Sequence, residues 1–217
     1  MKTYQLKLKL LSAALIGSGE GFGSLIDTDI VFDDAGIPFV PSKRIKGCLL
    51  DSAEEVRTLF DSSHINCLMD INKTFGETGN SESGAVYFSN LTIEDYDKNK
   101  AWLDYFLKNN KYPDLLSKER ILETFTEIRQ QTAIDNGVAK DSSLRTIRVI
   151  KKGFEFYGDV HIDNETEAIV NTLNLSCLNF RFMGTKRNRG LGEVHCSLLK
   201  DGNELSIRKN LEELCTV

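Results

Sequence analysis

A loop that combines glycines with cations is the part of this sequence best suited to binding a ligand. It spans residues 184–192 and reads Gly-Thr-Lys-Arg-Asn-Arg-Gly-Leu-Gly. Its glycines let the backbone approach a ligand closely, and its ammonium and guanidinium groups can grip phosphate oxygens. We therefore predict a phosphate-binding loop, with an ordinary solvated turn as the alternative. The residues predicted to bind are Gly184, Lys186, Arg187, Arg189 and Gly190.

A second basic group stands where a helix is expected to begin. Ser42 is the predicted N-cap, and Lys43, Arg44 and Lys46 fall in the first turn. Cations are unfavourable at the positive end of a helix dipole unless an anion is bound there. This placement favours a second phosphate contact over a plain surface helix. A third basic stretch carries Arg145, Arg148, Lys151 and Lys152, and solvated surface charge explains it equally well.

Four aspartates lie between the first predicted strand and this helix. Asp33 and Asp34 are expected to form a turn, because short acidic side chains favour turns. Asp27 and Asp29 have no such explanation, since they stand directly before an extended apolar segment that begins at Ile30. Carboxylates beside a phosphate-binding surface can hold a divalent ion or move a proton during phosphodiester cleavage.

Other kinds of site find less support. The glycine-rich loop from Gly17 to Gly23 fits neither a dinucleotide fingerprint nor a P-loop. His64 and Cys67 have ligand-like spacing, but no second pair lies nearby, so no zinc is predicted. His161 and His195 fall inside predicted strands, where structural roles are expected.

Composition indicates an ordinary globular chain. The 217 residues are 41% hydrophobic and 27% charged, with a net charge of -5. Disorder, collagen and coiled coil are excluded as the main state, and no apolar run is long enough to span a membrane. The five cysteines are odd in number and irregularly spaced, so we predict free thiols in the cytoplasm. The acidic charge argues against a nucleic-acid partner unless the cations gather on one face.

The elements that must position these residues follow from hydrophobic periodicity. Alternating apolar residues predict a first strand over 3–13 rather than a weak signal peptide. A helix is expected from residue 42, then a strand over 85–93, then further strands over 154–162 and 193–199. Helical spacing predicts another helix over 169–180, with Gly184 as its C′ residue. The predicted class is α+β, with the βαββαβ order of ferredoxin-like and RNA-recognition folds.

Two insertions and one hairpin are expected within this skeleton. The chain from about 61 to 83 is polar, and the chain from about 96 to 128 contains two helical stretches, the second continuing through Ile128. Residues from about 129 to 152 resemble a projecting hairpin with a Gly/Asp/Asn/Ser-rich tip. We treat residues 1–217 as a single domain.

Several of these segments together resemble the RAMP superfamily. The resemblance is carried by the glycine-rich loop, by Asp27-Thr28-Asp29-Ile30-Val31, by the segment 36–47 and by the closing loop 184–192. The stretch Gln131-Thr132-Ala133-Ile134-Asp135, with Gly137 and Ser143-Leu144 after it, is similar to the thumb hairpin of one subgroup. That subgroup is the backbone subunit of type III CRISPR effector complexes.

The resemblance implies a palm that polymerises along a CRISPR guide RNA, with copies of itself and other complex subunits as partners and no membrane. Thumb residues such as Thr132 and Arg145, together with both basic groups, would contact RNA. Asp27 matches the aspartate that supports metal-dependent cleavage of bound complementary target RNA in active members. The implied cofactor is a divalent ion, Mg²⁺, for which no ligand set is assigned.

Two other functions remain open at this level. A purely structural backbone subunit would bind RNA without cutting it. A guide-processing endoribonuclease of the same superfamily would use a histidine or tyrosine as general base without metal. His64 is the histidine that we place outside the strands, so it is the candidate base for that function.

Overall fold

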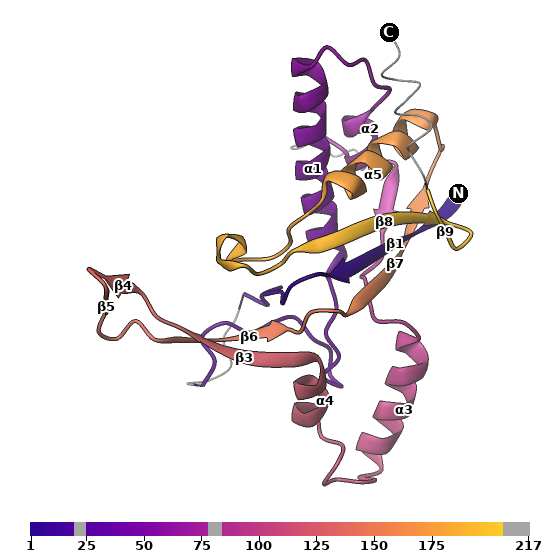
Figure 1. The fold of residues 1–217 in the computed structure, drawn as a ribbon. Coiled ribbons are helices and arrows are strands. Elements are labelled where there is room, and N and C mark those ends of the chain that lie inside the picture. The colour runs from indigo at the N-terminus through magenta and orange to yellow at the C-terminus, as the bar shows by residue number, and fades with distance from the viewer. Residues whose placement is uncertain (20–24, 78–83, 206–217) are drawn as a thin grey trace.

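The computed structural model describes residues 1–19, 25–77 and 84–205. Most of the predicted glycine-rich loop from Gly17 to Gly23 lies outside these ranges. The described chain forms a sheet covered by two helices, a separate pair of helices, and a long hairpin that projects from the body (Figure 1). The α+β class is confirmed. No helix in the described ranges has both the length and the apolar character needed to cross a membrane.

The central sheet has five strands in the order β2-β7-β1-β8-β9, and every neighbouring pair is antiparallel. The first four strands have the spatial order that the predicted βαββαβ succession produces. The strands are β1 (Lys2–Leu10), β2 (Val86–Phe88), β7 (Glu155–Ile162), β8 (Val194–Lys200) and β9 (Asn203–Glu204).

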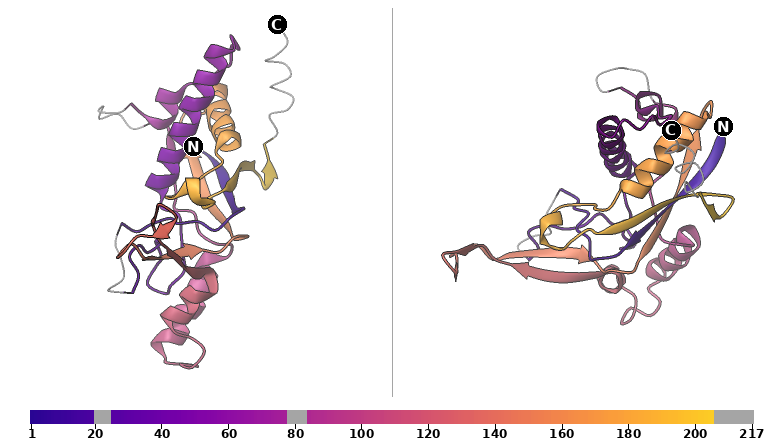
Figure 2. Two further views of the ribbon diagram at one scale, coloured as in Figure 1. Left: turned by 60° about the vertical axis from the view of Figure 1, so that its left-hand side comes forward. Right: turned by 45° about the horizontal axis from the view of Figure 1, so that its top comes forward.

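Alternation along β1 creates the core. Tyr4, Leu6, Leu8 and Leu10 are buried on one face, because side chains of a strand point alternately to its two sides. That face is covered by α1 (Ser42–Ser62) and α5 (Glu167–Asn179), as Figures 1 and 2 show.

The insertion that follows α1 contains one short helix, α2 (Ile71–Phe75). Its N-cap is Asp70, whose carboxylate accepts a hydrogen bond from the backbone N–H of Lys73. Of the two residues considered for zinc, Cys67 is buried and His64 is exposed.

The second insertion holds α3 (Tyr96–Lys108) and α4 (Lys118–Phe125), at the opposite end of the molecule from α1 and α5 (Figure 1). Ser117 caps α4 by accepting a hydrogen bond from the backbone N–H of Arg120. The prediction that this helix continues through Ile128 is wrong, because the backbone turns extended at Thr126.

The projecting hairpin pairs β3 (Thr126–Gln131) with β6 (Arg145–Ile150), so it begins three residues earlier than expected. Its tip pairs β4 (Ile134–Asp135) with β5 (Val138–Ala139). Ile147, Val149 and Ile150 are fully buried at the base, whereas the tip is exposed. The hairpin is thus anchored by its second strand and extends away from the sheet (Figure 2).

Candidate nucleic-acid interface

Asp27 is fastened to the base of the hairpin. Its backbone N–H donates to the carbonyl of Thr146 at 2.9 Å, and the Thr146 N–H donates back to Asp27 Oδ2 at 2.7 Å. Thr28 forms a parallel bridge with Ile147 next to this pair. The segment around Asp27 therefore runs beside β6, and 119 residues of sequence separate the two partners.

The two unexplained aspartates have different surroundings. The Asp29 side chain is only 6% exposed, lies 2.9 Å from Arg148 Nη1, and accepts a hydrogen bond from the Ile30 N–H. The Asp27 side chain is 41% exposed and makes a longer ion pair of 3.6 Å with Arg145. Asp29 is thus an internal structural group, while Asp27 is open to a ligand. Arg148, for which solvated surface charge was one open explanation, instead balances the buried charge of Asp29.

The closing basic loop reaches the same place from the other side. It contains a 3₁₀ turn, η1 (Arg187–Arg189), preceded by Lys186 in the left-handed conformation. Lys186 Nζ donates to Gln131 Oε1 at 2.7 Å, which ties the loop to the end of β3. Burial lowers the pKa of Lys186, and the charge of Arg189 lowers it further, while Asp27 acts in the opposite direction. Lys186 is therefore influenced by the charges of both Arg189 and Asp27.

A cavity of about 380 Å³ opens at this junction. Four of the predicted RNA-binding residues line it, although they come from three separate segments. They are Thr132, Arg145, Lys186 and Arg189. Lys140 lines it as well, so four cations surround one cavity that also includes the carboxylate of Asp141. With the exposed Asp27 carboxylate next to Arg145, this arrangement suits a phosphodiester chain.

Sequence reasoning missed several polar groups at this cavity, and two of them make hydrogen bonds that shape it. Gln131 holds Lys186, and Ser143 shares a hydrogen bond of 2.6 Å with the Thr132 hydroxyl. Both fall in the stretch that resembles a thumb. An isolated glutamine or serine carries no chemical signal that would have singled it out.

Gly184 is correctly identified as a special position, but the predicted reason is wrong. The helix α5 ends at Asn179 with Phe180 as its C-cap, so Gly184 is not the C′ residue. Gly184 has φ +84°, and a Cβ there would lie 2.4 Å from the Leu15 carbonyl oxygen. It is needed because two chain segments cross closely. Gly190 also has a positive φ, yet a Cβ would meet open space.

The start of α1 does not join the cavity. Pro41 is the N-cap, without a side-chain hydrogen bond, so the prediction that Ser42 caps the helix is wrong. The Ser42 N–H instead donates to Asn90 Oδ1 at 2.9 Å. Arg44 donates to the Gly17 carbonyl at 2.9 Å, which commits its guanidinium to the chain after β1. Lys43 is exposed and Lys46 is half-buried.

Arg187 connects the closing loop with α1. Burial and Asp51 raise the pKa of the Cys48 thiol, whereas Arg187 and Arg44 act against that rise. Arg187 also lines a small cavity of about 120 Å³ with Cys48 and Asp51. The three cations of the loop therefore diverge, with Lys186 and Arg189 toward the hairpin and Arg187 toward the helix.

Acidic side chains gather elsewhere, in a cleft of about 1040 Å³ beside β7 and the start of α3. Its carboxylates come from Asp33, Asp34, Glu94, Asp95, Asp97 and Asp159. Lys98 and Lys100 lie among them. This cleft and the cavity at the hairpin base share no lining residue. A chain of net charge -5 can therefore still present a cationic surface at the hairpin.

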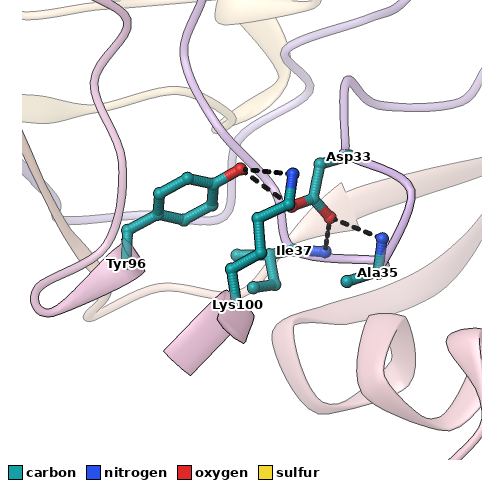
Figure 3. A network of polar contacts seen from close by, with 5 residues as sticks. All are labelled: Asp33, Ala35, Ile37, Tyr96 and Lys100. Carbon is teal, nitrogen blue, oxygen red and sulfur yellow. Dashed lines mark hydrogen bonds and ion pairs between the residues drawn. The ribbon is translucent and has the colours of Figure 1, made fainter. Parts of the chain in front are cut away.

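One of these acids performs the predicted turn role. Asp33 Oδ1 accepts hydrogen bonds from the N–H groups of Ala35 and Ile37, at 3.0 and 2.8 Å (Figure 3). Its other oxygen accepts from the Tyr96 hydroxyl at 2.8 Å and lies 3.3 Å from Lys100 Nζ. Asp33 therefore both closes the turn and attaches α3.

Comparison with known proteins agrees with this architecture. A family model described as the RAMP superfamily matches residues 7–195. No curated protein matches the sequence significantly. A solved structure described as type III-B Cmr-beta bound to cognate target RNA is 15% identical and has a TM-score of 0.65. The alignment covers 94% of this chain and 99% of that chain. The apo state of Cmr-beta gives a TM-score of 0.62 at 15% identity, over 93% and 98% of the two chains.

Proposed function

Since this chain belongs to the RAMP superfamily, we propose that it is a guide-RNA-binding subunit of a type III CRISPR effector complex. Copies of the chain would line up along the guide with other subunits, and each would cleave the bound target RNA beside Asp27. The observation that carries this proposal is the convergence of an exposed aspartate with cations at the base of a projecting hairpin. Two structures of similar fold come from a type III-B assembly, one of them bound to target RNA.

RNA binding rests on the cationic cavity. Arg145 and Arg189 offer planar donor sets that match phosphate oxygens, and Lys186 is held in place by Gln131. Because a single strand has a phosphate at every nucleotide, affinity should fall steeply as salt rises. Exposed apolar side chains at the hairpin tip, Ile134 and Val138, would separate neighbouring bases.

Cleavage would use Asp27 with a divalent cation. The described residues hold no cluster of three or more potential metal ligands. Mg²⁺, however, is commonly held by one or two carboxylates together with substrate phosphates and water. Asp27 fits that pattern, since its side chain is partly exposed and, among the described residues, Oδ1 has only the longer contact to Arg145. When bound, the ion would polarise the scissile phosphate. The Thr146 N–H would orient the carboxylate, and Arg145 would bind the phosphate.

The Asp27–Arg145 ion pair also favours a second candidate, a structural subunit that binds RNA without cutting. In that case Asp27 would serve to order the base of the hairpin. The processing-enzyme alternative has less support. His64 follows the end of α1, and a helix of 21 residues separates it by about 30 Å from the basic residues at the start.

The deciding experiment compares two isosteric substitutions in the assembled complex with Mg²⁺. Asp27→Asn should abolish target cleavage while guide binding, measured on a native gel, stays unchanged. Asp34→Asn, an exposed aspartate in the same segment, is the matched control and should cut normally. Unchanged cleavage by the Asp27 variant would establish the structural candidate instead.

RNA binding itself is tested on the purified chain. Titration with single-stranded RNAs of increasing length should produce evenly incrementing shifted species that weaken with salt. A single species formed with hairpin RNA alone, cut in EDTA, would support the processing enzyme.

A further inference from the structure

Helix α3 is fixed to the protein along one side. Its inward side chains recur at helical spacing and pack on Ala35, Ile37 and Ile121. They are Tyr96, Leu103 and Leu107. The polar contacts of Tyr96 and Lys100 with Asp33 also fix the rotation of the helix about its axis (Figure 3). The helix therefore presents its opposite side outward in a defined orientation.

The outward side is aromatic rather than polar. Trp102 is 57% exposed, Tyr105 is 47% exposed, and Tyr112 beyond the helix is 61% exposed. Trp102 stacks on Phe106 with ring centroids 5.9 Å apart and an interplanar angle of 23°. Phe106 in turn meets the edge of Tyr112 at 6.0 Å. We call Trp102, Tyr105, Phe106 and Tyr112 the α3 aromatic cluster. Such contiguous exposed rings mark a binding surface.

Cations border the α3 aromatic cluster. Lys111 Nζ lies 5.0 Å from the centre of the Tyr105 ring and donates to the Tyr105 hydroxyl at 3.2 Å. Lys108 is exposed one turn after Tyr105. The helix carboxylates, Asp97 and Asp104, are rotated by about 80° or more from Trp102 and Tyr105 by helical geometry. The outward face is therefore aromatic and cationic.

These charges identify the class of partner. Two copies joined through the same face would bring the lysines of one copy against those of the other, and such like-charge contacts are unfavourable. An RNA single strand matches both features, because bases stack on aromatic rings and phosphates pair with ammonium groups. The acidic cleft adjoins the first turn of α3, so the strand would lie over Trp102 toward Lys111.

We propose that the α3 aromatic cluster is a second binding surface for single-stranded RNA, which stacks bases on Trp102 and Tyr105 and holds phosphates with Lys108 and Lys111. The inference rests on the proposed function in taking RNA as the partner. It adds a separate contact, because α3 lies apart from the hairpin tip (Figure 1).

The sequence supplies a reporter for this surface, since Trp102 is the sole tryptophan. Short oligouridylate and oligoadenylate should quench its emission saturably, and raised salt should weaken the effect. Excitation at the red edge of indole absorption reduces absorption of the exciting light by RNA. Free mononucleotides at equal absorbance control for the light that RNA still absorbs. Tyr105→Ala should bind about tenfold more weakly through loss of one stack, whereas Tyr105→Phe keeps the ring and should bind normally.

A double variant separates this surface from the hairpin base. Arg145→Ala with Lys186→Ala should reduce the anisotropy change of end-labelled RNA but leave the Trp102 quenching in place. Labelled RNA that binds without quenching Trp102 would overturn the inference while leaving the proposed function intact. Emission that responds to protein concentration rather than RNA would assign the face to protein contacts and overturn it too. Failure of both readouts would reject both proposals.

Discussion

Two aspartates in the chain between β1 and α1 show how similar local chemistry leads to different roles. Asp27 and Asp33 each accept a backbone hydrogen bond, and each meets a cation from a distant part of the sequence. The Asp33 side chain is 8% exposed, and both of its oxygens accept well-formed hydrogen bonds. The Asp27 side chain is 41% exposed, and its ion pair is long.

The difference separates a structural carboxylate from an available one. A buried carboxylate must be fully satisfied, and removal of it leaves its partners buried without a hydrogen bond. A partly exposed carboxylate whose oxygens are not all held in short contacts can exchange its water for a metal ion that also binds phosphate. At the hairpin base, Asp27 is therefore available to a ligand. At the other end of the segment Asp33 holds α3 in place, and we call Asp33 with its four donors the anchor.

The largest expected effect tests the anchor. Asp33→Ala should lower the free energy of unfolding by about 3 kcal/mol, because four donors lose a buried acceptor. Asp27→Ala should change it by about 0.5 kcal/mol or less, since water replaces the lost contacts. Urea denaturation of both variants measures the contrast. Equal losses would show that Asp27 is as structural as Asp33.

A somewhat smaller effect is expected in the closing loop. Gly184→Ala should cost about 2 kcal/mol, because the new Cβ would strike the Leu15 carbonyl at a positive φ. Gly190→Ala, with a positive φ but open space around it, should cost about 1 kcal/mol. Comparing the thermal unfolding of the two variants separates the cost of the contact with Leu15 from the cost of the positive φ. A Gly190 variant as unstable as the Gly184 variant would contradict this account.

The contribution of one hydrogen bond in the anchor should be smaller again. Tyr96→Phe removes the hydroxyl that donates to Asp33 and keeps the ring against the core. We expect a loss of about 1 kcal/mol in unfolding free energy. A matched control is Tyr112→Phe, at a more exposed ring beyond α3. If the two variants lose the same amount, the Tyr96 hydroxyl has no special part in holding α3.

The smallest effect concerns pH at the hairpin base. Burial lowers the pKa of Lys186, so its positive charge is lost at a lower pH than that of an ordinary lysine. RNA affinity should therefore decline as pH rises toward that lowered pKa, because only the protonated amine attracts phosphate. Lys186→Arg stays charged and should remove this part of the decline. Fluorescence anisotropy with labelled RNA across alkaline pH tests the difference, and identical profiles would exclude Lys186 from the contact.

Local patterns were sufficient to predict the main strands of the central sheet and the two helices that cover it. The alternation in β1, the helical spacing in α1 and α5, and the apolar runs of β7 and β8 are each determined by neighbours within a few residues. Boundaries were less predictable. Residues 126–128 continue an apolar helical spacing, yet they form β3 because Thr126 to Gln131 can pair with Arg145 to Ile150.

Residue types also marked the candidate site in the sequence. Glycines with cations in one loop, and an aspartate without a turn role, are visible in the chain itself. What the sequence left open is which of Asp27 and Asp29 is available, and which cations share a cavity with each other. Arg44 and Arg187 belong to the same predicted groups as Lys43 and Lys186, but they face other parts of the protein.

Local patterns in the chain predict the α+β class, the order of the main elements and the kinds of chemistry that the loops can support. The meeting of Asp27, Arg145 and Lys186 at the base of the hairpin is visible only in the folded protein. The two levels differ in the range over which their interactions act. Periodicity and turn chemistry act over a few residues, whereas this site depends on strand order and on backbone hydrogen bonds between segments 119 residues apart.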